Sequence, residues 1–160
     1  MFEEGKAMTL KILRFIGILC AALTLGLTVT HVLEIPGKRE LSGEMWLIVQ
    51  HSFYGGFAII GGVAEVLGFI TTIAILFLTW KNRRIFFLTL VGAFGFMSTL
   101  LTYWIGNRPI NFKIAQWTQS TLPGNWETYR DYWDLAHSIT AVFSLIAFVF
   151  LMLTVLGNSK

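Results

Sequence analysis

The sequence predicts an all-α integral membrane protein: a four-helix up-down bundle with a long outer loop between its third and fourth helices. Hydrophobic residues make up 55% of the 160 residues and charged residues only 13%, a balance too apolar for a water-soluble domain of this length. The charges gather in clusters that separate apolar runs of about 20 residues, the length that spans a bilayer as a helix. We therefore expect one transmembrane domain over residues 1–160, in contact with membrane lipid.

The predicted spans follow these apolar runs in order. They cover residues 12–33, 46–80, 85–106 and 132–156. A polar segment with Pro36 and Gly37 links the first span to the second, and the basic turn 81–84 links the second to the third. Residues 107–131 form the longest connection, which is the predicted outer loop.

The second span is longer than a bilayer requires. At 1.5 Å per residue it would measure roughly 50 Å, against a hydrocarbon core of about 30 Å. It must therefore protrude, tilt or break. The pairs Gly55–Gly56 and Gly61–Gly62 are the expected places for a break or for close approach of a neighbouring helix.

The basic residues indicate the orientation in the membrane. With alternating spans, the compact cluster 81–84 shares a side with Lys6, Lys11, Arg14 and the C-terminal Lys160. Because cytoplasmic flanks are enriched in Lys and Arg, we expect both termini in the cytoplasm. The net charge of +3 comes from such flanks, so no nucleic-acid partner is expected. The single cysteine, Cys20, excludes an intrachain disulfide.

The three histidines of the chain fall on the outer side in this topology. His31 closes the first span, His51 lies early in the second, and His137 opens the fourth. Imidazoles are costly at membrane depth unless they pair, bind a metal or line a polar cavity. Counted at 1.5 Å per residue, Tyr103 and Glu65 match the depth of His31 and His137 best, whereas His51 joins them only if its helix kinks.

Glu65 is the only carboxylate well inside an apolar span. It should face the interior of the bundle and be protonated, paired or metal-bound. His51, Tyr54 and Glu65 share nearly one helix face, which predicts a polar path from the outer surface. Near the other histidines, Asp134 precedes His137 by one turn and Glu34 follows His31, so Asp134 is a candidate to fix the tautomer of His137.

These residues leave the cofactor open. Two histidines with Glu65 would suit iron or zinc, and His31, His51 and His137 together would suit copper or zinc. Two histidines from different helices would also suit a haem. A pocket of His, Glu and Tyr that transfers protons without any cofactor fits equally well.

The outer loop is rich in aromatic and amide side chains, which either form an interfacial belt or a lid over the site. Its motifs are Asn107-Arg-Pro-Ile-Asn111, Ile114-Ala-Gln-Trp117, Pro123-Gly-Asn-Trp126 and Arg130-Asp-Tyr-Trp133, followed by His137. This succession resembles the anthrone oxygenase-like family of small integral membrane proteins, over about residues 105–150 and in the four-span layout. A departure is Thr140, where the family often has Arg.

The resemblance implies oxidation of an anthrone to an anthraquinone, with no cofactor firmly established. The positions it matches to the family are Asn111, Trp117, Trp126, Arg130, Trp133 and His137. We therefore expect an integral membrane oxidoreductase or oxygenase for a lipophilic, aromatic or phenolic compound. His137 or His31 would remove a proton, with Asn111 and Arg130 stabilising the oxyanion or holding the loop.

Two alternatives remain open at this stage. One is a metal- or haem-binding bundle for electron transfer or metal handling. The other is a small accessory protein without enzymatic activity, whose polar cluster holds the helices together. Small residues around Gly92 and Gly95 leave open whether that surface packs within the bundle or between subunits of a homo-oligomer.

Overall fold

The computed structural model describes residues 2–157, and side chains from residue 4 onward. Over this range the chain is helical and has no strand. The helices are α1 (Phe2–Arg39), α2 (Gly43–Thr79), α3 (Arg83–Thr102), the π-helical turn η1 (Tyr103–Asn107), α4 (Arg108–Ile114) and α5 (Trp126–Leu156). They form four segments long and apolar enough to cross a membrane. The predicted all-α four-helix bundle is confirmed, and the protein is an integral membrane protein.

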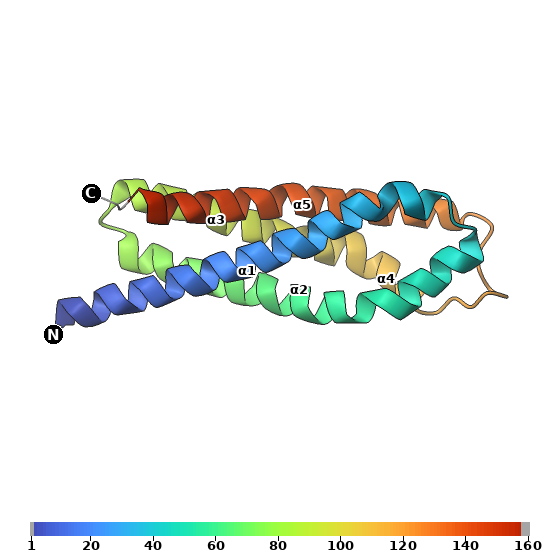
Figure 1. Cartoon of the computed structure of the whole chain (residues 1–160), viewed down its shortest axis with the longest axis horizontal. Helices are drawn as coiled ribbons and strands as arrows, with labels where there is room; N and C mark the ends of the chain where they lie inside the picture. The colour runs from blue at the N-terminus through green and yellow to red at the C-terminus, as the bar shows by residue number, and fades with distance from the viewer. Residues whose placement is uncertain (1, 158–160) are drawn as a thin grey trace.

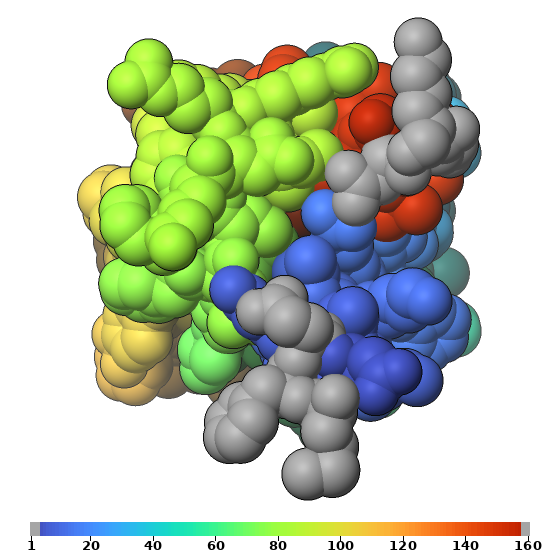
Figure 2. Space-filling view, turned by 90° about the vertical axis from the view of Figure 1, so that its left-hand side faces the viewer, coloured from blue at the N-terminus to red at the C-terminus, as the bar shows by residue number. Residues whose placement is uncertain are grey.

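The described ends of the chain lie at the same end of the bundle (Figure 1). Figure 2 looks onto this end, where the start of α1 lies beside the α2–α3 turn and the end of α5. The basic residues Lys6, Lys11, Arg83 and Arg84 therefore gather here. Lys160, used above for the orientation, lies outside the described residues.

Helix α1 continues past the predicted end of the first span. Residues 34–39 are helical, with Pro36 inside the helix, and only residues 40–42 link α1 to α2. The Lys38 ammonium lies 2.8 Å from the Glu34 carboxylate one turn earlier, and Lys38 and Arg39 face the negative end of the helix dipole. These contacts, together with the burial of Lys38, offset the cost of the proline.

The predicted outer loop is wrong at both ends, because residues 107–114 and 126–131 are helical and only 115–125 connect α4 to α5. Pro109 lies within this helical stretch, although proline lacks an N–H and crowds the carbonyl four residues earlier. Here the helix widens into η1, where the Arg108 N–H donates to the Tyr103 carbonyl. The wide π turn accommodates the proline without ending the helix.

Helix α2 runs without interruption over 37 residues and bows away from the other helices (Figure 1). A Cβ atom added at Gly55, Gly56 or Gly62 would meet nothing within 4 Å, so these glycines do not mediate close packing within the chain. The close approach occurs instead at Gly68, where an added Cβ would collide with the Phe96 ring. The outer half of α2 is therefore held apart from α3.

The inner half of the bundle packs through small residues. An added Cβ at Gly95 would lie 2.9 Å from the backbone N of Ala147 and from the Phe143 carbonyl oxygen, and one at Gly92 would lie 3.1 Å from Leu151. Gly92 and Gly95 thus pack within the bundle, between α3 and α5. Fully buried threonines such as Thr72 and Thr89 donate to carbonyls of their own helix, so they leave no unpaired hydroxyl donor.

Candidate functional site

A cavity of about 400 Å³ lies where α2 bows away, between α1, α2, the α3–η1–α4 segment and α5. Its wall is mostly apolar and aromatic. Several of the residues singled out from the sequence line it: His31, His51, Tyr54, Glu65, Tyr103, Asn111, Trp133 and His137. Helices from both ends of the sequence bring His31 and His137 to one space, as the up-down topology predicts. His51 also reaches this space, although α2 has no break.

His31 and His137 form a contacting pair in the wall of this cavity. Their ring centroids are 4.2 Å apart with the planes tilted by 42°, and the Trp133 ring lies 4.1 Å from His137 and 4.9 Å from His31. The Nδ1 atoms of both histidines are buried without a hydrogen-bond partner. Buried ring nitrogens without partners are costly, so the pair has unused capacity to bind a ligand or move a proton.

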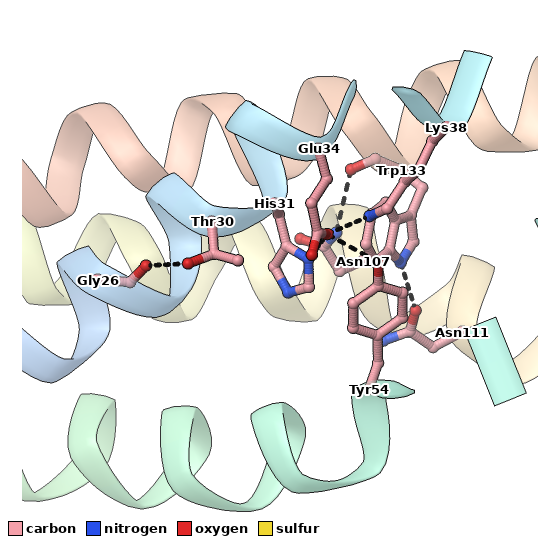
Figure 3. A network of polar contacts seen from close by, with 9 residues as sticks. All are labelled: Gly26, Thr30, His31, Glu34, Lys38, Tyr54, Asn107, Asn111 and Trp133. Carbon is pink, nitrogen blue, oxygen red and sulfur yellow. Dashed lines mark hydrogen bonds and ion pairs between the residues drawn. The ribbon is translucent and has the colours of Figure 1, made fainter. Parts of the chain in front are cut away.

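Glu34 connects this pair to the outer end of the bundle. Its Oε2 atom accepts a 2.8 Å hydrogen bond from the Tyr54 hydroxyl, lies 2.8 Å from Lys38 Nζ and lies 3.7 Å from His31 Nδ1 (Figure 3). The Glu34 side chain is 36% exposed, whereas that of Lys38 is 5% exposed. Glu34 is thus the polar contact between outer solvent and the cavity.

Lys38 is a site residue that the sequence did not single out, because a lysine near the end of a span resembles an ordinary charge flanking the membrane. Its ammonium lies 4.4 Å from the centroid of the Tyr54 ring and 4.6 Å from that of Trp133. Cation–π contact with two rings and the ion pair with Glu34 compensate its burial. The i, i+4 spacing of Glu34 and Lys38 was the signal available in the sequence.

Asp134 does not orient His137. Its side chain is 2% exposed, and neither carboxylate oxygen has a hydrogen-bond partner. The Nδ1 atom of His137 is likewise buried without a partner. The charged groups that interact with it are instead Lys38, Arg39, Arg130 and Asp131. The predicted Asp134–His137 hydrogen bond is absent.

Amide side chains fasten α4 to α5 beside the histidine pair. The Trp133 indole N–H donates to Asn111 Oδ1 at 2.8 Å, and Asn107 Nδ2 donates to the Trp133 carbonyl at 3.4 Å. His51 Nε2 lies 3.0 Å from the carbonyl oxygen of Ile114 and so ties α2 to the end of α4. Asn111 keeps its amide NH₂ for a ligand, because only its oxygen is used by Trp133.

Several predicted residues lie outside the cavity. Trp126 and Trp117 pack against the cluster of Trp46, Leu47, Ile114 and Trp133 at the outer end. The Arg130 guanidinium contacts Asp131 at 3.3 Å and lies over the Trp126 ring, so it is not placed to stabilise an oxyanion in the cavity. These aromatic residues form the outer packing layer, and Asn107 serves the helix junction described above.

Gln50 is a second residue that the sequence analysis missed. It lines the cavity, is 9% exposed, and its Nε2 atom is buried without a hydrogen-bond partner. A buried amide donor without a partner is uncommon and calls for an explanation. Its position on α2 one residue before His51 was the only sequence signal, and glutamine alone does not distinguish a buried site from a polar helix end.

The predicted metal-ligand sets are not assembled. Within residues 2–157, no three or more His, Cys, Asp or Glu side chains are grouped to hold a metal ion. His51 is engaged by Ile114, and Glu65 lies farther inward along α2. The contacting rings of His31 and His137 also leave no space for a porphyrin between them, so this pair does not fit axial ligation of a haem.

Together, the fold and the cavity define the class of the chain: an integral membrane helical bundle with a histidine-lined cavity in the half that lies away from the described chain ends. Comparison with protein-family models, with curated protein sequences and with solved structures gave no significant match. The resemblance to the anthrone oxygenase-like family therefore stays a prediction from the loop motifs.

Proposed function

We propose that the protein is an integral membrane oxidoreductase of the oxygenase type, which acts on a lipophilic aromatic or phenolic compound in this cavity. The observation that carries the proposal is the contact between His31 and His137 in the wall of an otherwise largely apolar cavity. Such a cavity admits a flat, apolar molecule, and the paired imidazoles give it a base for an acidic O–H or C–H.

In the proposed reaction, His31 or His137 takes a proton from a phenol or from the CH₂ group beside a carbonyl. The resulting carbanion transfers its electron pair to dioxygen, which is the oxidant, and protonation gives a hydroperoxide. Loss of water from the hydroperoxide leaves a carbonyl, so CH₂ and O₂ become C=O and H₂O. The imidazole that took the proton returns it to the peroxide, so no net proton leaves the site. Glu34, whose Oε2 atom lies 3.7 Å from His31 Nδ1, would stabilise the imidazolium in the meantime.

Gln50 and Asn111 would stabilise the negative charge that develops on the substrate oxygen. Both line the cavity, and each has an amide NH₂ group that donates no hydrogen bond to a described residue. Preorganised donors at the site of developing charge contribute most when water is excluded. This role replaces the one predicted for Arg130.

We further infer that both termini lie in the cytoplasm and that the cavity opens toward the outer half of the membrane. The inference rests on the basic residues at the end of the bundle that holds the termini. Cysteine substitution at Lys6 and at residue Thr118 of the 115–125 loop, followed by labelling with a membrane-impermeant thiol reagent, tests it. If only Thr118→Cys is labelled in intact cells, the proposed orientation is supported. If only Lys6→Cys is labelled, the orientation is the opposite of the one proposed.

The proposed activity is tested by dioxygen uptake of the detergent-purified full chain with a panel of anthrones and hydroquinones. Uptake should require the protein and should fall in His31→Ala and His137→Ala. Tyr132→Phe, at an exposed residue that does not line this cavity, should leave uptake unchanged. Turnover that survives in both histidine variants would sink the proposal.

A metal site at His31 and His137 is the second candidate, favoured by their two buried Nδ1 atoms without partners. Elemental analysis by mass spectrometry, together with a visible spectrum, distinguishes it. Near-stoichiometric iron, copper or zinc that is lost in both histidine variants would support metal handling or metal-assisted oxidation. Metal that stays bound in both variants would exclude this pair as the ligands.

A further inference from the structure

Glu65 is the only carboxylate that lines the cavity, and no described residue neutralises it. It is 9% exposed, and within residues 4–157 no side chain forms a hydrogen bond or an ion pair with it. No Lys or Arg lines the cavity. A carboxylate in such surroundings is costly, so any positive charge that pairs with it must come from the occupant of the cavity.

The wall beside Glu65 leaves room for such a group. Gly61 and Gly62 lie one turn before Glu65 on α2 and also line the cavity. A Cβ atom at Gly62 would meet nothing within 4 Å, and one at Gly61 would meet only Leu27, at 3.6 Å. A ligand in the cavity can therefore reach the Glu65 carboxyl group past two glycines, which have no side chains to block it.

An aromatic ring lies at a similar depth on the opposite wall. The contact between Gly68 and Phe96 gives a common reference level for α2 and α3. Counted from this level toward the histidine end of the bundle, Glu65 is three residues away on α2. Tyr103 is seven residues away, on the segment formed by α3 and η1. At 1.5 Å per residue, Tyr103 lies about 6 Å farther out than Glu65. Trp104 also lines the cavity, but Arg108 already lies over its ring at 4.5 Å.

The cavity reaches lipid at this depth. Val66 beside Glu65 and Trp104 on the facing segment both line it, and they are 49% and 56% exposed. Because both side chains face the surroundings of a membrane-spanning bundle, a lipophilic molecule can enter sideways between α2 and η1.

We propose that the inner end of the cavity binds the positively charged group of a lipophilic molecule, a protonated or quaternary amine, between the Glu65 carboxylate and the Tyr103 ring. The carboxylate supplies the opposite charge and the ring face supplies cation–π attraction, both strengthened by the exclusion of water. A compact metal ion fits less well, because it requires several oxygen ligands and Glu65 is the only carboxylate here.

This site goes beyond the proposed oxidation and stands apart from it in space. The contact between Gly68 and the Cβ atom of Cys20 gives a common reference level for α1 and α2. Counted from this level toward the histidine end, His31 is eleven residues away on α1 and Glu65 is three residues away on α2. The two therefore differ in depth by about 12 Å. A molecule that occupied both ends would carry its amine about 12 Å from its oxidised ring.

The test is equilibrium binding of tetraphenylphosphonium to the purified full chain, with tetraphenylborate as a probe of the same shape and opposite charge. We expect tetraphenylphosphonium to bind at one site per chain and to lose about tenfold or more in affinity in Glu65→Gln. Glu65→Asp should retain more affinity than Glu65→Gln. Tyr103→Leu should weaken binding, whereas the matched change Tyr132→Leu, on an exposed tyrosine that does not line this cavity, should not.

Equal affinity in wild type and Glu65→Gln, or tighter binding of tetraphenylborate than of tetraphenylphosphonium, overturns the proposal. Glu65 has no protein partner to lose, so Glu65→Gln should fold, and its helical circular dichroism and thermal midpoint verify this. His31→Ala separates the two proposals. It should bind tetraphenylphosphonium as wild type does even where dioxygen uptake is lost, and lost binding in this variant would place the cation at the histidine pair instead.

Discussion

The imidazole ring of His31 on α1 lies 4.2 Å, centroid to centroid, from that of His137 on α5. The two residues come from the first and last helices, and each contacts Trp133 as well. Two adjacent rings with unused buried nitrogens act as a unit, because protonation of one imidazole makes a positive charge on the other less favourable.

This contact predicts that His31 and His137 are not independent in the proposed oxidation. His31→Ala and His137→Ala should each reduce turnover by about a hundredfold or more, the range for loss of a general base. The double variant should lose much less than the product of the two, since both act on one proton transfer. Dioxygen uptake by the three variants measures this, and multiplicative losses would show that the pair does not act together.

The ion pair of Glu34 and Lys38 predicts an asymmetry in stability. Glu34→Gln leaves a buried ammonium without its counter-charge, which costs about 3–5 kcal/mol for a fully buried pair and less where one partner is exposed. Lys38→Met leaves a carboxylate that is 36% exposed to solvent, so it should cost less. Unfolding of both variants in matched mixed micelles provides the measurement, and a more stable Glu34→Gln variant would contradict the prediction.

The packing of α3 against α5 predicts that substitution by alanine lowers stability at Gly95, in this interface, but not at Gly55, which lies on α2 away from it. Gly95→Ala places a methyl group 2.9 Å from backbone atoms of α5, which cannot move aside, so the bundle should lose about 1–3 kcal/mol of stability. Gly55→Ala meets nothing and should be neutral or stabilising by up to about 1 kcal/mol through helix propensity. Thermal denaturation in detergent compares them, and similar midpoints would argue against this interface.

The hydrogen bond from the Trp133 indole N–H to Asn111 Oδ1 predicts that these two positions are energetically coupled. Asn111→Ala leaves the buried indole N–H without an acceptor, a cost of about 1–3 kcal/mol. In a Trp133→Phe background this donor is absent. Asn111→Ala should therefore cost less there than in the wild type. A double-mutant cycle measures the coupling energy between the two positions. A coupling near zero would mean that another group accepts from the indole.

The sequence predicted which residues reach the cavity better than it predicted their partners. The cavity is shared by residues that alternating spans bring to one half of the bundle, although His31 and Glu65 differ in depth along it by about 12 Å: His31, His51, His137, Glu65, Tyr54 and Tyr103. Asp134 was misassigned, because spacing along a helix does not determine which rotamer each side chain adopts. Lys38 and Gln50 were missed, because a lysine or glutamine near the end of a span is indistinguishable in sequence from an ordinary interfacial residue.

By itself, the sequence determined that this chain crosses the membrane as four helices and that its histidines lie in one half of the bundle. Both follow from the length and order of apolar runs, since a bilayer fixes how many residues one span requires. Only the tertiary structure decided which side chains touch. Contacts such as His31–His137 depend on the rotation of each helix about its axis and on the bow of α2. Close packing at Gly68, Gly92 and Gly95 sets those rotations between residues far apart in the chain.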